Sequence, residues 1–237
     1  MKTVMRILAL AALLALCLSI PALADAPTVT VNGSAQVSVA TDHAIIHLGV
    51  RTKSETPTEA QAENKQRTEA VMKALIEECG IAEDKIATSS FSIYTQSEWL
   101  EGTGEEKQYY QVTHQLSVTV SDIDKAGAVI DTAVEAGANI IDYVSFESSS
   151  MKEAYEKALR EAVADAKHKA ELIAEASGMK LGDLVSITTT SGGGEFYNNS
   201  FRMKEEAADA AGATKLAPGT QNTTAGVTAV WKMIPAE

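Results

Sequence analysis

The chain has 237 residues and carries 32 acidic against 20 basic side chains, a formal net charge of −12 at pH 7. An acidic excess of this size repels polyanions and argues against nucleic acid as a partner. The length is enough for one large hydrophobic core or two small ones.

The first 24 residues have the pattern of a secretory signal peptide. Lys2 and Arg6 form a basic start, residues 7–20 are predominantly apolar, and Ala24 is a small residue at the expected cleavage position. We therefore predict an exported mature chain, 25–237, with no stable membrane span, located in the periplasm, on the cell surface or outside the cell. A single membrane anchor is the alternative, but the apolar run is short for a bilayer span.

After this cleavage the chain keeps one cysteine, Cys79. A single cysteine cannot form an intrachain disulfide. It has no basic neighbour in the sequence, so a half-buried structural role is favoured over redox chemistry.

The N-terminal part of the mature chain predicts two strands. Residues 29–39 (VTVNGSAQVSV) alternate apolar and polar side chains with a period of two. Residues 43–50 (HAIIHLGV) are partly apolar on both faces, which is typical of a more central strand.

A helix with clear end signals follows. Thr56 is placed as its N-cap, Pro57 as its first residue, and Glu59 three positions after the cap. We expect this helix to run to Cys79 and to stop at Gly80, which supplies a left-handed cap.

The middle of the chain predicts a long hairpin. Residues 86–99 and 109–120 have strand character, and the turn-rich segment EGTGEEK joins them. A second helix is expected to begin after Ser121 and to end near Gly137, and residues 139–148 (NIIDYVSFES) predict a further strand.

The third helix is the best specified element. Ser150 and Glu153 are expected to form a capping box, and Gly178 to end the helix. Small side chains at every fourth position predict close packing on a sheet or another helix: Ala154, Ala158, Ala162, Ala166 and Ala170. Acids precede bases by four positions along the rest of the helix, which is typical of a solvated face: Glu153–Lys157, Glu156–Arg160 and Asp165–Lys169.

The C-terminal part predicts a strand at 184–190 and a last strand at 225–233 (AGVTAVWKM). Residues 191–217 between them lack strand periodicity, and a loop of this length is often functional or disordered. The resulting order, ββαββαβαββ, predicts an α+β fold with mostly antiparallel sheets and packed helices.

The long loop contains the one group of residues whose composition points to a function. Phe196, Tyr197 and Phe201 lie beside Arg202 and Lys204 in a chain otherwise poor in aromatic residues. Exposed aromatic side chains with arginine suit a protein interface. The alternative is that they fold over the edge of a sheet and shield it, and both interpretations stay open.

No catalytic, cofactor-binding or metal-binding residues are predicted. His43 and His47 are four positions apart on a strand, roughly 13 Å, which is too far for one metal ion. His114 lies in the apolar register of its strand, where a hydrogen-bonded core or edge histidine is favoured. The glycine-rich segment 191–194 lacks the Gly-Lys-Ser/Thr ending of a phosphate loop, and no serine lies in a Gly-x-Ser-x-Gly turn.

Five segments of the chain resemble the SIMPL domain family, also known as DUF541, a domain of unknown function. They occur in the same order as in the family: VTVNGSAQVSVATDHAIIHLGV, GIAEDKIATSSFSIY, VTVSDIDKAGAVIDTAVEAGAN, ALREAVADAKHKAELIAEASGMKLGDLVSI and LAPGTQNTTAGVTAVW. The resemblance covers nearly all of the mature chain, although Thr41 stands where the family usually has proline. It implies two intertwined subdomains. Some bacterial members are described as ring- or channel-like oligomers or linked to oxidative-stress tolerance, and a eukaryotic namesake is a kinase-binding adaptor. The resemblance supplies no catalytic motif.

We therefore expect an exported, non-enzymatic protein that acts by self-assembly, as a homo-oligomer, or by protein binding, through sheet edges and the loop 191–217. Envelope or oxidative-stress tolerance is the expected cellular context. The alternatives are an enzyme with an unrecognised site, which a deep pocket with convergent carboxylates, His114 or threonine hydroxyls would favour, and a module that binds a small ligand or a metal.

Overall fold

A computed structural model describes residues 26–99, 106–190 and 214–236. The order of its long elements, ββαββαβαββ, confirms the predicted α+β fold. The elements are β1 (Thr28–Ala40), β2 (His43–Ser54), α2 (Pro57–Glu77), β3 (Ile86–Trp99), β4 (Glu106–Val120), α3 (Ala126–Glu135), β5 (Ile140–Glu147), α4 (Met151–Ala176), β6 (Met179–Thr189) and β7 (Thr220–Pro235), with single 3-10 turns at Glu83–Lys85 and Ile123–Lys125.

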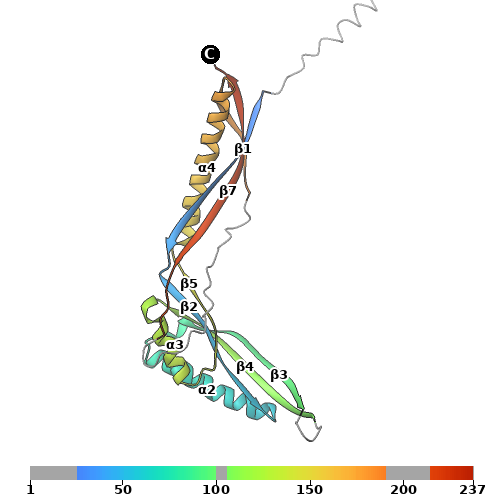
Figure 1. Ribbon diagram of the computed structural model, residues 1–237, viewed down its shortest axis with the longest axis vertical. Coiled ribbons are helices and arrows are strands. Elements are labelled where there is room, and N and C mark those ends of the chain that lie inside the picture. The colour runs from blue at the N-terminus through green and yellow to red at the C-terminus, as the bar shows by residue number, and fades with distance from the viewer. Residues whose placement is uncertain (1–25, 100–105, 191–213, 237) are drawn as a thin grey trace, which may run out of the picture.

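Two antiparallel sheets divide the chain into two units. The first sheet has the order β1-β7-β6 and the second the order β3-β4-β2-β5. The chain begins in the first sheet, builds the whole of the second, and returns to the first through α4. The predicted intertwining is thus a property of the topology, and Figure 1 shows the two units placed end to end along the long axis of the molecule.

In the first unit, which we call the α4 unit, α4 lies along one face of the three-stranded sheet (Figure 1). The predicted alanine ladder is fully or nearly fully buried and extends to Ala174. Its small side chains allow a very close approach, because a Cβ added to Gly33 on β1 would lie 2.1 Å from the backbone oxygen of Ala162. Trp231 and alternate residues of β7 complete this core.

In the second unit, which we call the α2 unit, α2 and α3 pack on the same hydrophobic core of the four-stranded sheet. Strand β2 pairs with both β4 and β5, so its predicted central position is confirmed. The largest fully buried side chains of this core come from β2, α2 and β4, among them Ile46, Leu48, Leu75 and Leu116.

The N-terminal cap predicted for α2 is present in the structure, whereas the one predicted for α4 is not. Thr56 caps α2 as predicted, because its hydroxyl accepts a hydrogen bond from the Glu59 N–H at 3.3 Å. The capping box predicted for α4 is wrong. Ser150 adopts φ −89° and ψ 9°, outside the extended conformation of an N-cap, and its side chain makes no capping bond. The neighbouring Ser148 bonds to this turn instead, accepting from the Ser150 N–H at 3.3 Å.

The end of the predicted loop rests on the α2 unit. Residues 214–219 have no regular secondary structure. The Thr214 hydroxyl donates to Asp131 Oδ1 on α3 at 2.7 Å, and its N–H donates to Asp131 Oδ2 at 3.1 Å. Gly127 on α3 allows Thr214 to lie this close to the helix, since a Cβ added at Gly127 would lie 1.8 Å from the Thr214 oxygen.

Candidate functional site

Each sheet ends in two edge strands, whose outer backbone groups have no strand partner within the described chain. On β1 two of these groups are hydrogen-bonded by side chains of α4. The Ser34 N–H donates to Asp165 Oδ2 at 2.9 Å, and Lys169 Nζ donates to the Asn32 oxygen at 3.2 Å. Lys169 also lies 2.7 Å from Asp165, and these hydrogen bonds lower the pKa of the Asp165 carboxyl. Charged side chains placed on an edge in this way prevent the addition of another strand.

This arrangement corrects one part of the sequence interpretation. The pair Asp165–Lys169 was expected to lie on a solvated helix face, but it forms a contact between α4 and β1. The pair Glu156–Arg160 does lie on an exposed face, with the two charged groups 3.8 Å apart. Lys157 lies 3.9 Å from Glu161 rather than pairing with Glu153 as predicted.

The outer edge of β3 is open by comparison. From Ser90 to Trp99 this strand pairs with β4 without a break, and among the described residues no side chain hydrogen-bonds to the backbone of β3. Its large apolar side chains are exposed: Phe91 49%, Ile93 42%, Tyr94 60% and Trp99 71%. We call the segment Ser90–Trp99 with these side chains the β3 edge. In Figure 1, β3 forms the outer side of the β3–β4 hairpin, on the side of β4 away from β2.

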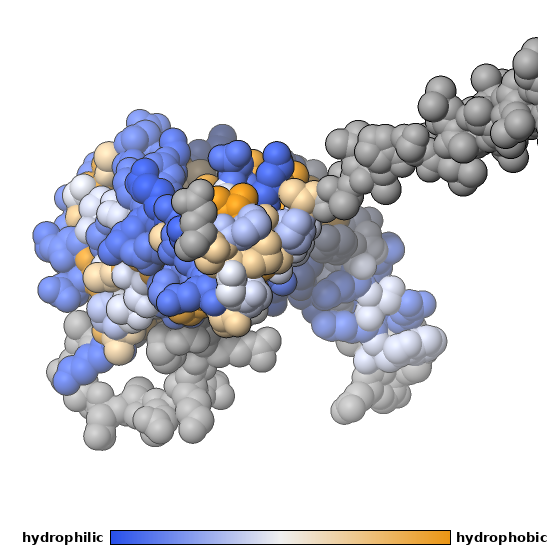
Figure 2. Space-filling model, turned by 90° about the horizontal axis from the view of Figure 1, so that it is seen from above, coloured by the Kyte–Doolittle hydropathy of each residue, from blue (hydrophilic) through white to orange (hydrophobic). Residues whose placement is uncertain are grey.

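The other two edge strands are less regular. Strand β6 exposes Leu184, Val185 and Ile187, but its register shifts twice within the strand. Strand β5 has eight residues, and its pairing with β2 shifts between His47 and Leu48. Figure 2, which looks onto the outer end of the α4 unit, shows a small apolar group surrounded by hydrophilic residues. Irregular, short edges are poor templates for strand addition.

A groove lies beside α2, over β3 and β4. It has a volume of about 330 Å³ and is lined by Gln61, Asn64, Lys65, Thr68, Glu69, Met72, Phe91 and His114. We call it the α2 groove. His114 Nε2 lies 2.9 Å from the Thr88 hydroxyl, which confirms the predicted hydrogen-bonded histidine. The Phe91 ring meets the His114 ring edge to face, with centroids 5.4 Å apart. Partial burial lowers the pKa of the imidazole.

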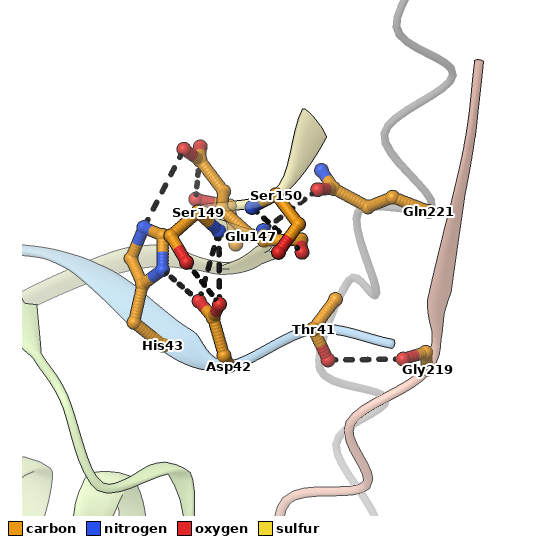
Figure 3. Close-up of polar contacts among 10 residues, drawn as sticks. Thr41, Asp42, His43, Glu147, Ser149, Ser150, Gly219 and Gln221 are labelled. Atoms are coloured by element: carbon orange, nitrogen blue, oxygen red, sulfur yellow. Dashed lines mark hydrogen bonds and ion pairs between the residues drawn. The ribbon is translucent and has the colours of Figure 1, made fainter. Parts of the chain in front are cut away.

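A polar network joins the two units at the point where the chain passes between them (Figure 3). The Asp42 carboxylate accepts from the Ser149 N–H at 3.0 Å and from the Ser149 hydroxyl, and it lies 2.6 Å from His43 Nδ1. The hydrogen bonds from Ser149 and His43 lower the pKa of Asp42 to about 2. Glu147 lies on the other side of the ring, with Oε2 3.9 Å from His43 Nε2.

Backbone contacts reinforce this junction. The Asp42 N–H donates to the Glu147 oxygen at 2.8 Å, and the Ser148 N–H donates to Gln221 Oε1 at 2.9 Å. The Thr41 hydroxyl donates to the Gly219 oxygen at 2.9 Å, a bond that a proline at position 41 could not make. Three places where the described chain passes between the units, at residues 40–43, 147–151 and 219–221, are thereby tied together, which makes the junction a structural element that sets how the units are joined.

The remaining residues that the sequence singled out lie apart from one another. His47 stacks on Tyr143 of β5, with ring centroids 4.3 Å apart. Within the described ranges no group of three or more His, Cys, Asp or Glu side chains is arranged to hold a metal ion. Phe196, Tyr197, Phe201 and Arg202 lie outside the described residues, as does the predicted signal peptide. In the part of the chain that the structure describes, no helix is long and apolar enough to cross a membrane.

Comparison with known proteins identifies the family. The family model described as SIMPL, protein of unknown function (DUF541), matches residues 29–231. The chain belongs to the SIMPL family.

Members of the SIMPL family with curated descriptions resemble the chain at moderate identity. The 26 kDa periplasmic immunogenic protein of Brucella melitensis is 26% identical over 167 residues, which are 69% of this chain and 66% of the relative. The uncharacterized protein YggE of Escherichia coli is 26% identical over 165 residues, 70% of this chain and 66% of the relative. The matched region thus spans about two thirds of the length of these relatives.

Proposed function

We propose that this SIMPL protein is an exported, non-enzymatic protein that acts by binding polypeptide chains, its own copies first, through the β3 edge. The main support for this proposal is the difference between the outer edges of β1 and β3. Asp165 and Lys169 cover the backbone of β1, whereas the longer strand β3 presents its backbone together with exposed aromatic side chains. A long, regular and apolar edge is a template for an added strand.

The residues of the β3 edge suit a specific contact. Backbone hydrogen bonds supply affinity in strand addition, and alternate side chains supply specificity. Tyr94 and Trp99 are of the type that contributes most to binding energy in protein interfaces. In a pairing of two β3 edges the two copies are related by a two-fold axis; a contact between β3 and another edge, such as β6, would build a ring or a filament.

Two observations support an extracytoplasmic location. Residues 1–24 have the pattern of a signal peptide, and the Brucella relatives are named as periplasmic.

The resemblance to members linked with oxidative stress suggests envelope or oxidative-stress tolerance as the context. Survival of a deletion strain in peroxide tests this part: the wild-type gene should restore survival, and a gene with Tyr94→Lys should not. Equal restoration by both genes would separate any stress role from assembly.

Light scattering on the mature chain tests the assembly. The wild-type protein should form a defined oligomer at micromolar concentration, and Tyr94→Lys should shift it toward the monomer, because a lysine on an edge strand opposes strand addition. Val134→Lys is the matched control, since Val134 is similarly exposed but lies on α3. A monomeric wild-type protein, or an oligomer that Tyr94→Lys leaves intact, would contradict the proposal.

The α2 groove favours a second function, the binding of a small molecule. It contains His114 and the Thr68 hydroxyl, which are groups expected of such a pocket, but a single carboxylate, Glu69. That carboxylate lies 3.8 Å from Lys65, and both side chains are mostly exposed. This composition supports binding more than acid–base catalysis, which commonly uses a positioned, environmentally tuned acid or base.

A further inference from the structure

The α2 groove exists because α2 is fixed over the middle of its sheet. Asn64 Nδ2 donates to the Val50 oxygen at 2.8 Å and to the Val112 oxygen at 3.3 Å. The Thr52 hydroxyl donates to the Ala60 oxygen at 2.7 Å. These contacts hold the helix over β2 and β4, so the same face of β3 is left uncovered. The space between helix and strand is therefore built into the fold.

The lining of the groove has an apolar, aromatic side. Phe91 and His114 place two rings at an angle of 90°, and Met72 lines the same space from α2. Aromatic rings favour edge-to-face contacts with one another, and a thioether makes favourable contacts with ring edges. A flat aromatic molecule fits this combination better than a flexible aliphatic chain.

The charges in the groove balance. Lys65 and Glu69 form an exposed i,i+4 pair whose charges cancel. Partial burial lowers the pKa of His114, which favours the neutral form of the ring. A charged ligand would meet no unpaired opposite charge among these lining residues and would lose its hydration. Charge complementarity therefore favours an uncharged occupant.

His114 also offers one hydrogen-bonding position. Thr88 occupies Nε2, and Nδ1 has no partner among the described residues. In a neutral imidazole one nitrogen donates and the other accepts. If Nε2 accepts from the Thr88 hydroxyl, Nδ1 is the donor, and if Nε2 donates to that hydroxyl, Nδ1 is the acceptor. A hydroxyl group is the matching partner, because it can donate or accept.

We propose that the α2 groove binds a small, uncharged aromatic alcohol of one or two rings. A volume of about 330 Å³ lies at the lower end of the range for small-molecule pockets, roughly 300–1,000 Å³. It is too small for a helix or a strand of a partner protein, which sets this site apart from the β3 edge. The groove is a second binding site, which shares Phe91 with the β3 edge but lies on the face of the sheet that α2 partly covers.

Titration of the mature chain with 2-naphthol, followed by the fluorescence of the ligand, tests the proposal. Binding should saturate, and NMR signals of the His114 ring should shift on addition. Met72→Trp fills the groove and should weaken binding at least tenfold. Gln61→Trp, at an exposed position on the same lining, is a second blocking variant with little risk to folding. Leu172→Trp on the surface of α4 should leave affinity unchanged.

Two ligand analogues test the chemistry. Naphthalene lacks the hydroxyl and should bind several-fold more weakly, and 2-naphthoate carries a charge and should bind more weakly still. The proposal is overturned if 2-naphthol fails to saturate the protein, if both tryptophan variants in the groove bind it as the wild type does, or if 2-naphthoate binds more tightly than 2-naphthol.

Discussion

The Ser34 N–H on β1 donates a 2.9 Å hydrogen bond to the Asp165 carboxylate on α4, across 131 positions of the sequence. Together with the bond from Lys169 Nζ to the Asn32 oxygen, it occupies two outer backbone groups of β1 beside Gly33, where α4 approaches the strand closely. On β1 the helix of the same unit thus occupies two outer backbone groups, whereas among the described residues no side chain hydrogen-bonds to the backbone of the β3 edge.

Removing this cover should expose β1. The double variant Asp165→Ala, Lys169→Ala should lower the melting temperature and produce larger species in light scattering, because two outer backbone groups lose their partners. Glu161→Ala is the control, since Glu161 pairs with Lys157 on the same helix and makes no hydrogen bond or ion pair to a strand of the described chain. An unchanged size distribution in the double variant would show that these residues do not protect the edge.

The close packing of α4 on β1 depends on Gly33. Gly33→Ala should destabilise the protein by about 1–3 kcal/mol, the usual cost of overpacking, because the new Cβ would lie against the Ala162 oxygen and the Ala166 side chain. Urea unfolding measures the change. Gly219→Ala should be nearly neutral, since no atom lies within 4 Å of the added Cβ. Equal effects of the two substitutions would refute the packing argument.

The sequence predicted the inside of α4 well and its contact with β1 poorly. The alanine ladder follows from a local period, which periodicity reports reliably. The bonds of Asp165 and Lys169 depend on the register between α4 and a strand more than a hundred residues away, and the i,i+4 spacing is the same for a solvated pair. The capping box at Ser150 failed for a related reason: Asp42 holds Ser149 at the junction, and the turn follows from that distant contact.

The sequence also did not predict the α2 groove, although the polar residues on the inward side of α2 were a signal for it. Asn64 and Thr68 continue the helical stripe of Ala60, Val71 and Leu75, so two polar residues occupy inward positions. Polar residues at such positions are expected to hydrogen-bond in the interior. The alternation of β3 predicted a strand, but whether α2 covers it depends on strand order, which the sequence left open.

Asn64 should therefore be a determinant of stability. Asn64→Ala should cost about 1–3 kcal/mol, because the Val50 and Val112 oxygens would lose a buried donor. Chemical denaturation measures the loss. Gln66→Ala, on the exposed side of the same helix, should stay within about 0.5 kcal/mol of the wild type. A loss at Gln66 as large as at Asn64 would contradict the assigned role.

The junction predicts a specific response to acid. Hydrogen bonds lower the pKa of Asp42 from 3.8 to about 2 in the folded protein, so the unfolded chain binds the proton more readily. The contribution of Asp42 to stability is complete above pH 4 and is lost as the pH falls through about 2. The difference in unfolding midpoint between the wild type and Asp42→Asn should shrink over this window. A difference that stays constant from pH 6 to pH 2 would show that the network does not stabilise the ionised carboxylate.

Amide hydrogen exchange at increasing protein concentration tests the central claim, assembly through the β3 edge, most directly. Exchange of the Ser90–Trp99 amides should slow as the concentration rises, because an added strand protects the outer N–H groups. The Ser34 amide, already bonded to Asp165, should exchange at the same rate throughout. Exchange in β3 that does not depend on concentration, in a sample that light scattering shows to be oligomeric, would place the interface elsewhere and contradict the account.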